Sequence, residues 1–148
     1  MWGRSRLVIL YAGVLGIGAL LAIIWLGALS HEPSYVPMQA GTHQYLLAIA
    51  DTDAAREKGL GDIPSLATNK GMLFVYPGQQ ELCFWMKDMR FPLDILWLDG
   101  GHRVVTIRKH VQPSSYPEQF CATAQYVIEL NAGQVAAAHI IDGDVLNF

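Results

Sequence analysis

The segment from Leu7 to Leu29 constrains this chain most, because its 23 residues include no charged side chain. As an α-helix it would be roughly 35 Å long, enough to cross the ~30 Å hydrocarbon core of a bilayer with some tilt. Arg4 and Arg6 precede the segment, and the next Lys or Arg is Arg56. By the positive-inside rule, this asymmetry predicts a cytoplasmic N-terminus (residues 1–6), one transmembrane helix (residues 7–29) and a C-terminal part outside the membrane.

A cleaved signal peptide is the competing interpretation of the same segment. In Ala28-Leu29-Ser30, Ala28 and Ser30 are small residues placed as a cleavage site requires. The apolar region of a signal peptide usually has about 7–15 residues, and this one is much longer. We therefore expect a retained single-pass anchor whose partner is the lipid bilayer. Both interpretations place the rest of the chain outside the cytoplasm.

The residues after the apolar segment begin with a stretch of little periodicity that contains Pro33, Pro37 and Gly41. This composition favours an extended, solvated chain, so we expect a linker over residues 30–42. The exported domain then covers residues 43–148. The formal net charge of the whole chain is −3, which gives no sign of the basic surface that nucleic-acid binding requires. No nucleic-acid partner is expected.

Short apolar runs separated by turn signals predict a β-rich exported domain. The fold class that we expect is α+β and mostly β. About seven short strands would form a small, curved, antiparallel or mixed sheet or a barrel, with two short helices and the transmembrane helix in front. The expected helices are Ala54–Lys58, capped by Thr52 or Asp53, and Gln134–Ala138. The expected strands are Tyr45–Ala50, Gly71–Tyr76, Leu82–Met86, Leu93–Leu98, Arg103–Val111, Gln125–Leu130 and Val145–Phe148.

Five segments of the exported domain carry a resemblance to a known family. In chain order they are REKGLGDI, KGMLFVYP, CFWMKDMRFPLDILWLD, YVIELNAG and IIDGDVLNF. From about Tyr45 to Phe148 the chain resembles the uncharacterised family called domain of unknown function 192. The resemblance implies a compact β-rich domain, often behind a signal or an N-terminal anchor. It supplies no activity, cofactor or catalytic residue.

The chain contains two cysteines, Cys83 and Cys121, and both fall in the exported domain. Paired cysteines in a small domain outside the cytoplasm usually form a disulfide, so we expect a Cys83–Cys121 bond, with two free thiols as the alternative. Together with Met86 and Met89, Cys83 would also form a soft donor set suited to Cu(I). Cys83 and Met86 are three residues apart, and residues at this spacing on a strand face opposite sides of a sheet. We therefore expect no metal site here, and no cofactor is expected either.

Asp94 is a carboxylate within the apolar run Leu93–Leu98. Such a group must find partners, or its pKa rises. One interpretation is structural, as an ion pair or as a clamp on backbone N–H groups; the other is a functional carboxylate in a pocket. In the second case Trp85, Lys87 and Asp88 would border that pocket, and these residues together with Asp94 are the candidate binding site.

No catalytic signature is present, because the chain contains no G-x-S-x-G elbow, no P-loop and no H-E-x-x-H motif. Catalytic residues are therefore not identified, and an enzyme is not the leading hypothesis. We expect a membrane-anchored binding module outside the cytoplasm that recognises a small molecule, an envelope polymer or a protein. The alternatives are an enzyme with an unrecognised site around Asp94 and Lys87, and a structural or assembly component of the cell envelope.

Overall fold

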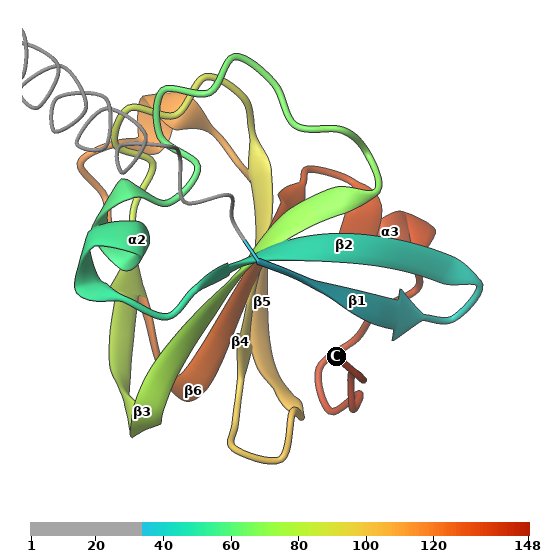
Figure 1. Cartoon of the computed structure of the whole chain (residues 1–148). Coiled ribbons are helices and arrows are strands. Elements are labelled where there is room, and N and C mark those ends of the chain that lie inside the picture. Colours follow the sequence, from blue (N-terminus) through green and yellow to red (C-terminus); the bar gives the residue numbers. More distant parts are fainter. Residues whose placement is uncertain (1–33) are drawn as a thin grey trace, which may run out of the picture. The chain divides into compact units, whose positions relative to one another are not determined.

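A computed structural model of the chain describes residues 34–148 as a mixed, open β-sheet (Figure 1). The six strands of this part follow the spatial order β1-β2-β3-β6-β4-β5. Strands β2 and β3 are parallel, and the other neighbouring pairs are antiparallel. The strands are β1 (Tyr35–Ala40), β2 (His43–Ala50), β3 (Lys70–Phe84), β4 (Leu93–Leu98), β5 (Val104–Val111) and β6 (Phe120–Asn131). The helices are α2 (Asp53–Lys58), the 3-10 helix η1 (Pro113–Ser115) and α3 (Gln134–Ala137).

The crossover between the parallel strands β2 and β3 contains helix α2. The hydroxyl of Thr52 accepts a hydrogen bond from the N–H of Ala55 at 3.2 Å, which caps the first turn. Gly59 ends the helix with a φ of 49°, a backbone conformation that favours glycine. Both features confirm the helix that the sequence predicted, and they fix where the chain turns back toward the sheet.

The sheet has a hydrophobic core on each face, because its central strands are buried on both sides. Leu96 and Ile128 point to the first face and pack with Val135 of α3. Trp97 and Val127, each one residue away in the sequence, point to the second face. The alternation of side chains along β4 and β6 therefore decides which core each residue joins.

The expected linker over residues 30–42 is wrong for the part that lies in β1. Strand β1 pairs with β2 in antiparallel register, and Met38 and Ala40 are 1% and 4% exposed. Pro37 is compatible with this strand because β1 is at the edge of the sheet, where a missing backbone N–H costs least. The folded unit thus begins before residue 43.

The sequence predicts two strands, Gly71–Tyr76 and Leu82–Met86, because Pro77-Gly78 between them is a turn signal. This separation is wrong, because β3 continues through Pro77-Gly78. The register between β3 and β6 shifts between Val75 and Gln80, so the proline lies in an irregularity that bends one long strand. The indole N–H of Trp97 donates a hydrogen bond to the carbonyl of Leu82 at 2.9 Å and ties the second half of β3 to the core. The predicted strands Gly71–Tyr76 and Leu82–Met86 therefore belong largely to one element.

The C-terminal segment Val145–Phe148 is not the predicted strand. It makes two isolated bridges, Gln39 to Asn147 and Arg103 to Val145. The sheet is consequently open, with edges at β1 and β5, and the barrel alternative is wrong. Within residues 34–148, no helix has the length and hydropathy needed to cross a membrane. The predicted anchor, residues 7–29, lies outside the described residues.

Candidate functional site

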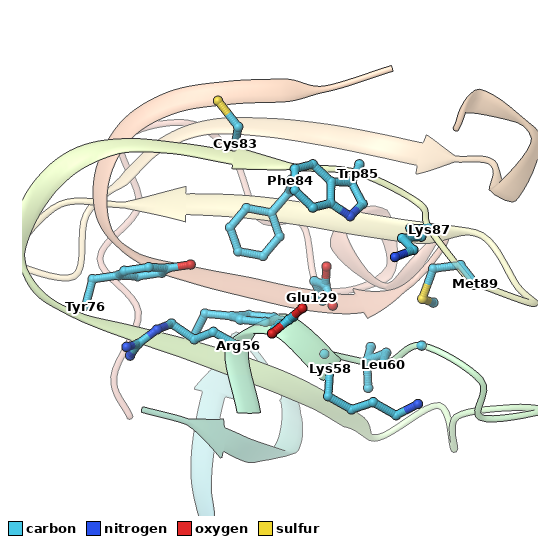
Figure 2. Close-up of a pocket in the computed structure, with 14 residues that line it drawn as sticks. Arg56, Lys58, Leu60, Tyr76, Cys83, Phe84, Trp85, Lys87, Met89 and Glu129 are labelled. Carbon is cyan, nitrogen blue, oxygen red and sulfur yellow. The ribbon is translucent and has the colours of Figure 1, made fainter. Parts of the chain in front are cut away.

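A pocket of about 410 Å³ lies on the second face of the sheet (Figure 2). Its walls come from α2 and the residues that follow it, from both halves of β3, from the loop after β3 and from β6. The lining residues are Arg56, Glu57, Lys58, Gly59, Leu60, Gly61, Phe74, Tyr76, Cys83, Phe84, Trp85, Lys87, Met89 and Glu129. The bend in β3 is what allows one strand to supply two opposing walls.

Glu129 supplies a buried carboxyl group to this pocket. It is 5% exposed, and it lies opposite Met72 of β3 and Ile95 of β4 in the sheet. In Figure 2 its carboxyl group lies in the middle of the ring of labelled side chains. Burial raises the pKa of Glu129 to about 8, because the charged form loses its hydration. At neutral pH the group is therefore mostly a protonated acid.

Two of the three basic residues that line the pocket, Arg56 and Lys58, direct their donors elsewhere. Nη1 of Arg56 donates to the carbonyls of Asp51 and Val75, each at 2.7 Å, and Nη2 pairs with Asp53. Nζ of Lys58 pairs with Asp62 at 2.7 Å. Among residues 34–148, no side-chain hydrogen bond or ion pair engages the Glu129 carboxyl group. The pocket thus contains an acid on a largely buried residue, whose oxygens open onto the pocket and have no protein partner.

Aromatic rings form much of the wall around that acid. Phe74 and Phe84 meet edge to face, with ring centroids 4.8 Å apart. The Arg56 guanidinium lies 4.9 Å from the centroid of the Tyr76 ring. Burial, more than any neighbouring charge, raises the pKa of Tyr76, so its hydroxyl remains protonated at neutral pH. Trp85 is 47% exposed and borders the opening.

Two of the four predicted binding residues, Trp85 and Lys87, line this pocket. Asp88 lies beside it and lines a neighbouring depression of about 360 Å³, which Trp85 and Lys87 also border. The structure therefore brings three of the four residues to one region of the surface.

Asp94 is at a different place. Its Oδ1 accepts the N–H of His110 at 2.9 Å, and its Oδ2 accepts the N–H groups of Gly133 at 2.9 Å and Val135 at 3.0 Å. The register places Asp94 opposite Leu130, one position from Glu129, so these two acids face opposite sides of the sheet. The geometry supports the structural interpretation of Asp94 as a backbone clamp.

The sulfur atoms of Cys83 and Cys121 are at disulfide bonding distance, as expected. The two residues are direct partners in the pairing of β3 with β6. Met86 is 1% exposed in the second core and Met89 lines the pocket, while the Cys83 sulfur lies against that of Cys121. Among the described residues, no group of three or more His, Cys, Asp and Glu side chains is arranged to hold a metal ion.

Sequence reasoning missed Glu129, although a signal was available. Like Asp94, Glu129 is an acid within an apolar strand segment, Gln125–Leu130. The requirement for partners applies to both residues. Tyr76, Phe74 and Arg56 carried no comparable signal, because aromatic and basic residues at such positions are common in any small domain.

Comparison with known proteins identifies the family. The model of the family DUF192, described as "Uncharacterized ACR", matches residues 36–148. This chain belongs to the DUF192 family. The match confirms the resemblance carried by the five sequence segments, and it brings no activity with it.

This DUF192 chain is similar to one curated protein and to two solved structures. UPF0127 protein TK1120 of Thermococcus kodakarensis is 28% identical over 102 residues, which are 68% of this chain, and the chain spans 62% of that protein's length. A crystal structure from Sinorhizobium meliloti 1021, described provisionally as a transcription regulator, has a TM-score of 0.75 at 26% identity and covers 80% of this chain and 96% of its own. A protein of unknown function from Novosphingobium aromaticivorans has a TM-score of 0.71 at 28% identity, with 80% and 94% covered.

Proposed function

We propose that this DUF192 chain is a membrane-anchored binding module. Residues 7–29 would hold it in the bilayer with the N-terminus in the cytoplasm, and the domain outside would bind a small molecule in the Glu129 pocket. The uncharged N-terminal run and the arginines before it support the anchor. The cysteine pair at bonding distance supports an oxidising compartment.

One observation carries the binding proposal, namely the buried Glu129 carboxyl group without a protein partner. Among the described residues, no side-chain N or O atom that is sealed from solvent lacks a hydrogen-bond partner, so the unpaired Glu129 oxygens are open to the pocket and available to a ligand. An open pocket with a hydrophobic wall and a few convergent polar groups is the usual form of a small-molecule site. A ligand in this pocket would supply the missing partner and would bury the aromatic rings further.

The alternative of an enzyme centred on Asp94 and Lys87 receives no support from the geometry. Asp94 holds three backbone N–H groups on one side of the sheet, and Lys87 lines the pocket on the other. The Sinorhizobium meliloti relative is described provisionally as a transcription regulator, and regulation by direct binding to nucleic acid would require a basic surface. The net charge of −3 does not favour it here.

Binding of a small-molecule library to the full chain, purified in mild detergent because of residues 7–29, tests the proposal. Trp85→Ala removes exposed area from the pocket wall, so we expect the affinity for any pocket ligand to fall about tenfold or more, a change of roughly 1.4 kcal/mol in binding free energy. The variant should still fold. Tyr35→Ala is the matched control, since Tyr35 is 45% exposed and lies outside the pocket lining. Equal affinities of wild type and Trp85→Ala for every hit would contradict the proposal.

A further inference from the structure

We infer that the pocket accepts a primary ammonium group, which lies among its aromatic rings and forms an ion pair with the Glu129 carboxylate. The inference rests on the proposed function and names the chemical class of the ligand. A free alkylamine and a lysine side chain of a protein both carry this group.

The first support is the missing counter-ion. Glu129 is 5% exposed, and the basic groups nearest to it on α2 are already engaged: Arg56 with Asp51, Val75 and Asp53, and Lys58 with Asp62. A charged carboxylate is costly to bury unless it is paired. An incoming ammonium would meet a carboxylate that Arg56 and Lys58 leave unpaired, and its three N–H donors match the two carboxylate oxygens.

The second support is the aromatic wall. Cations bind favourably over aromatic faces, and the attraction is strongest where water is excluded. The pocket already shows this contact once, because the Arg56 guanidinium lies 4.9 Å from the centroid of the Tyr76 ring. Phe74 and Phe84 offer further ring surface beside Glu129. A ligand with an apolar body and an ammonium end would use both properties of the aromatic wall, namely its apolar surface and its attraction for cations.

Other charged groups also line the pocket. Most of them are exposed, but the Arg56 side chain is only 16% exposed, and its charge is already paired with Asp53. Helix α2 contributes Arg56, Glu57 and Lys58, and the loop after β3 contributes Lys87. Lys58 and Lys87 are solvent-exposed, so water and salt screen their repulsion toward a cation inside. Tyr76 stays neutral at neutral pH because burial raises its pKa. Glu129 is therefore the group whose charge decides the affinity for an ammonium.

Binding of an ammonium group to Glu129 should release a proton, whereas binding of a neutral ligand should not. In the empty pocket at pH 7 the Glu129 carboxyl group mostly holds its proton, since its pKa is about 8. An ion pair requires the carboxylate, so the proton leaves to the buffer while the ammonium keeps all of its own. Binding at pH 7 should release close to one proton per ligand, and a neutral ligand should release none.

Isothermal titration calorimetry of the full chain in detergent tests the inference. Benzylamine is the probe, and benzyl alcohol is its neutral counterpart. Titrations in two buffers of different ionisation enthalpy count the protons released. Glu129→Gln is the decisive variant, and Glu81→Gln, an exposed position on β3 outside the pocket lining, is the matched control. Circular dichroism verifies that both variants fold.

We expect benzylamine to bind the wild type and Glu81→Gln with the release of about one proton, and Glu129→Gln to lose about tenfold or more in affinity. Equal binding of benzylamine and benzyl alcohol, unchanged by Glu129→Gln, would overturn the ammonium inference while the pocket remained a ligand site. If neither benzylamine nor benzyl alcohol binds, and Trp85→Ala binds every library compound as tightly as the wild type does, the proposed function is overturned as well.

A second amine distinguishes the two sources. Nα-acetyl-lysine methylamide carries the same ammonium group on the backbone of a protein residue. Tighter binding of this compound than of benzylamine, lost in Glu129→Gln, identifies a lysine side chain as the natural group. Tighter binding of benzylamine identifies a free amine. If neither compound depends on Glu129, the inference fails.

Discussion

At the scale of single residues, two buried acids in neighbouring register positions have opposite roles. Asp94 faces the first core and satisfies both of its oxygens with three backbone N–H groups. Glu129 faces the second core and has no side-chain partner among residues 34–148. Because side chains alternate along a strand, the two acids point to opposite faces of the sheet. Asp94 has a structural role on one face, and Glu129 is a candidate for ligand binding on the other.

The raised pKa of Glu129 predicts a pH dependence of stability. The folded chain retains a proton up to pH of about 8, whereas the unfolded chain releases it near the ordinary value of 4.5. Stability should therefore fall as the pH rises between these values, by up to about 1.4 kcal/mol per pH unit from this group. Glu129→Gln should be flatter over the same range. Urea unfolding of both chains at pH 5, 6, 7 and 8 measures the difference, and parallel curves would contradict it.

The backbone clamp at Asp94 predicts a large loss on truncation. Asp94→Ala leaves three N–H groups of the first core without an acceptor, and we expect a loss of roughly 3 kcal/mol or more in the free energy of unfolding. Asp142→Ala is the control, because Asp142 is exposed, and its effect should stay within about 0.5 kcal/mol. Denaturant unfolding measures both changes. A folded Asp94→Ala of wild-type stability would refute the clamp.

How far the sequence predicts the site depends on what each side chain does. Trp85 and Lys87 are predicted as the border of a pocket around Asp94, but they line the Glu129 pocket on the other face of the sheet. The role of Glu129 depends on the course of β3 and on where α2 packs, and neither is encoded near residue 129. Asp94 left two interpretations open, since the N–H groups that decide between them come from β5 and from the turn before α3.

At the scale of elements, the strands with strong apolar patterns were predicted and the irregular ones were not. Leu93–Leu98 matches β4, because a fully buried run bounded by turn signals has few other interpretations. Strand β1 was missed because Pro33, Pro37 and Gly41 outweigh its short alternation of buried and exposed residues. Strand β3 was divided because Pro77-Gly78 is a turn signal, whereas pairing with β6 carries the strand across it.

The disulfide acts at this scale, since it joins the C-terminal half of β3 to β6. Cys83 and Cys121 are 38 positions apart, and closing such a loop stabilises the folded chain by roughly 3–4 kcal/mol in the chain-entropy estimate. The double variant Cys83→Ser/Cys121→Ser should lose about this amount and should loosen the pocket wall at Cys83. Unfolding with and without reductant measures it. If reductant lowers the free energy of unfolding of the double variant as much as that of the wild type, the loss does not come from this disulfide.

At the scale of the whole molecule, the proposal places an acidic, disulfide-bonded domain outside the membrane behind a short cytoplasmic N-terminus. A tag fused after Phe148 should be degraded when protease is added to spheroplasts of a bacterial host. A tag before Met1 should survive until the membrane is dissolved. The positive-inside distribution of Arg4 and Arg6 is the physical reason. Protection of the C-terminal tag in intact spheroplasts would contradict the predicted topology.

The most direct test of a ligand site at Glu129 is the titration of its side-chain carboxyl carbon by ¹³C NMR in the full chain, with Glu129→Gln used to assign the signal. We predict a pKa of about 8 in the free chain and a clear decrease when benzylamine saturates the pocket. A signal that titrates near the ordinary value of 4.5 and does not respond to the amine would contradict the assignment of this pocket as a binding site.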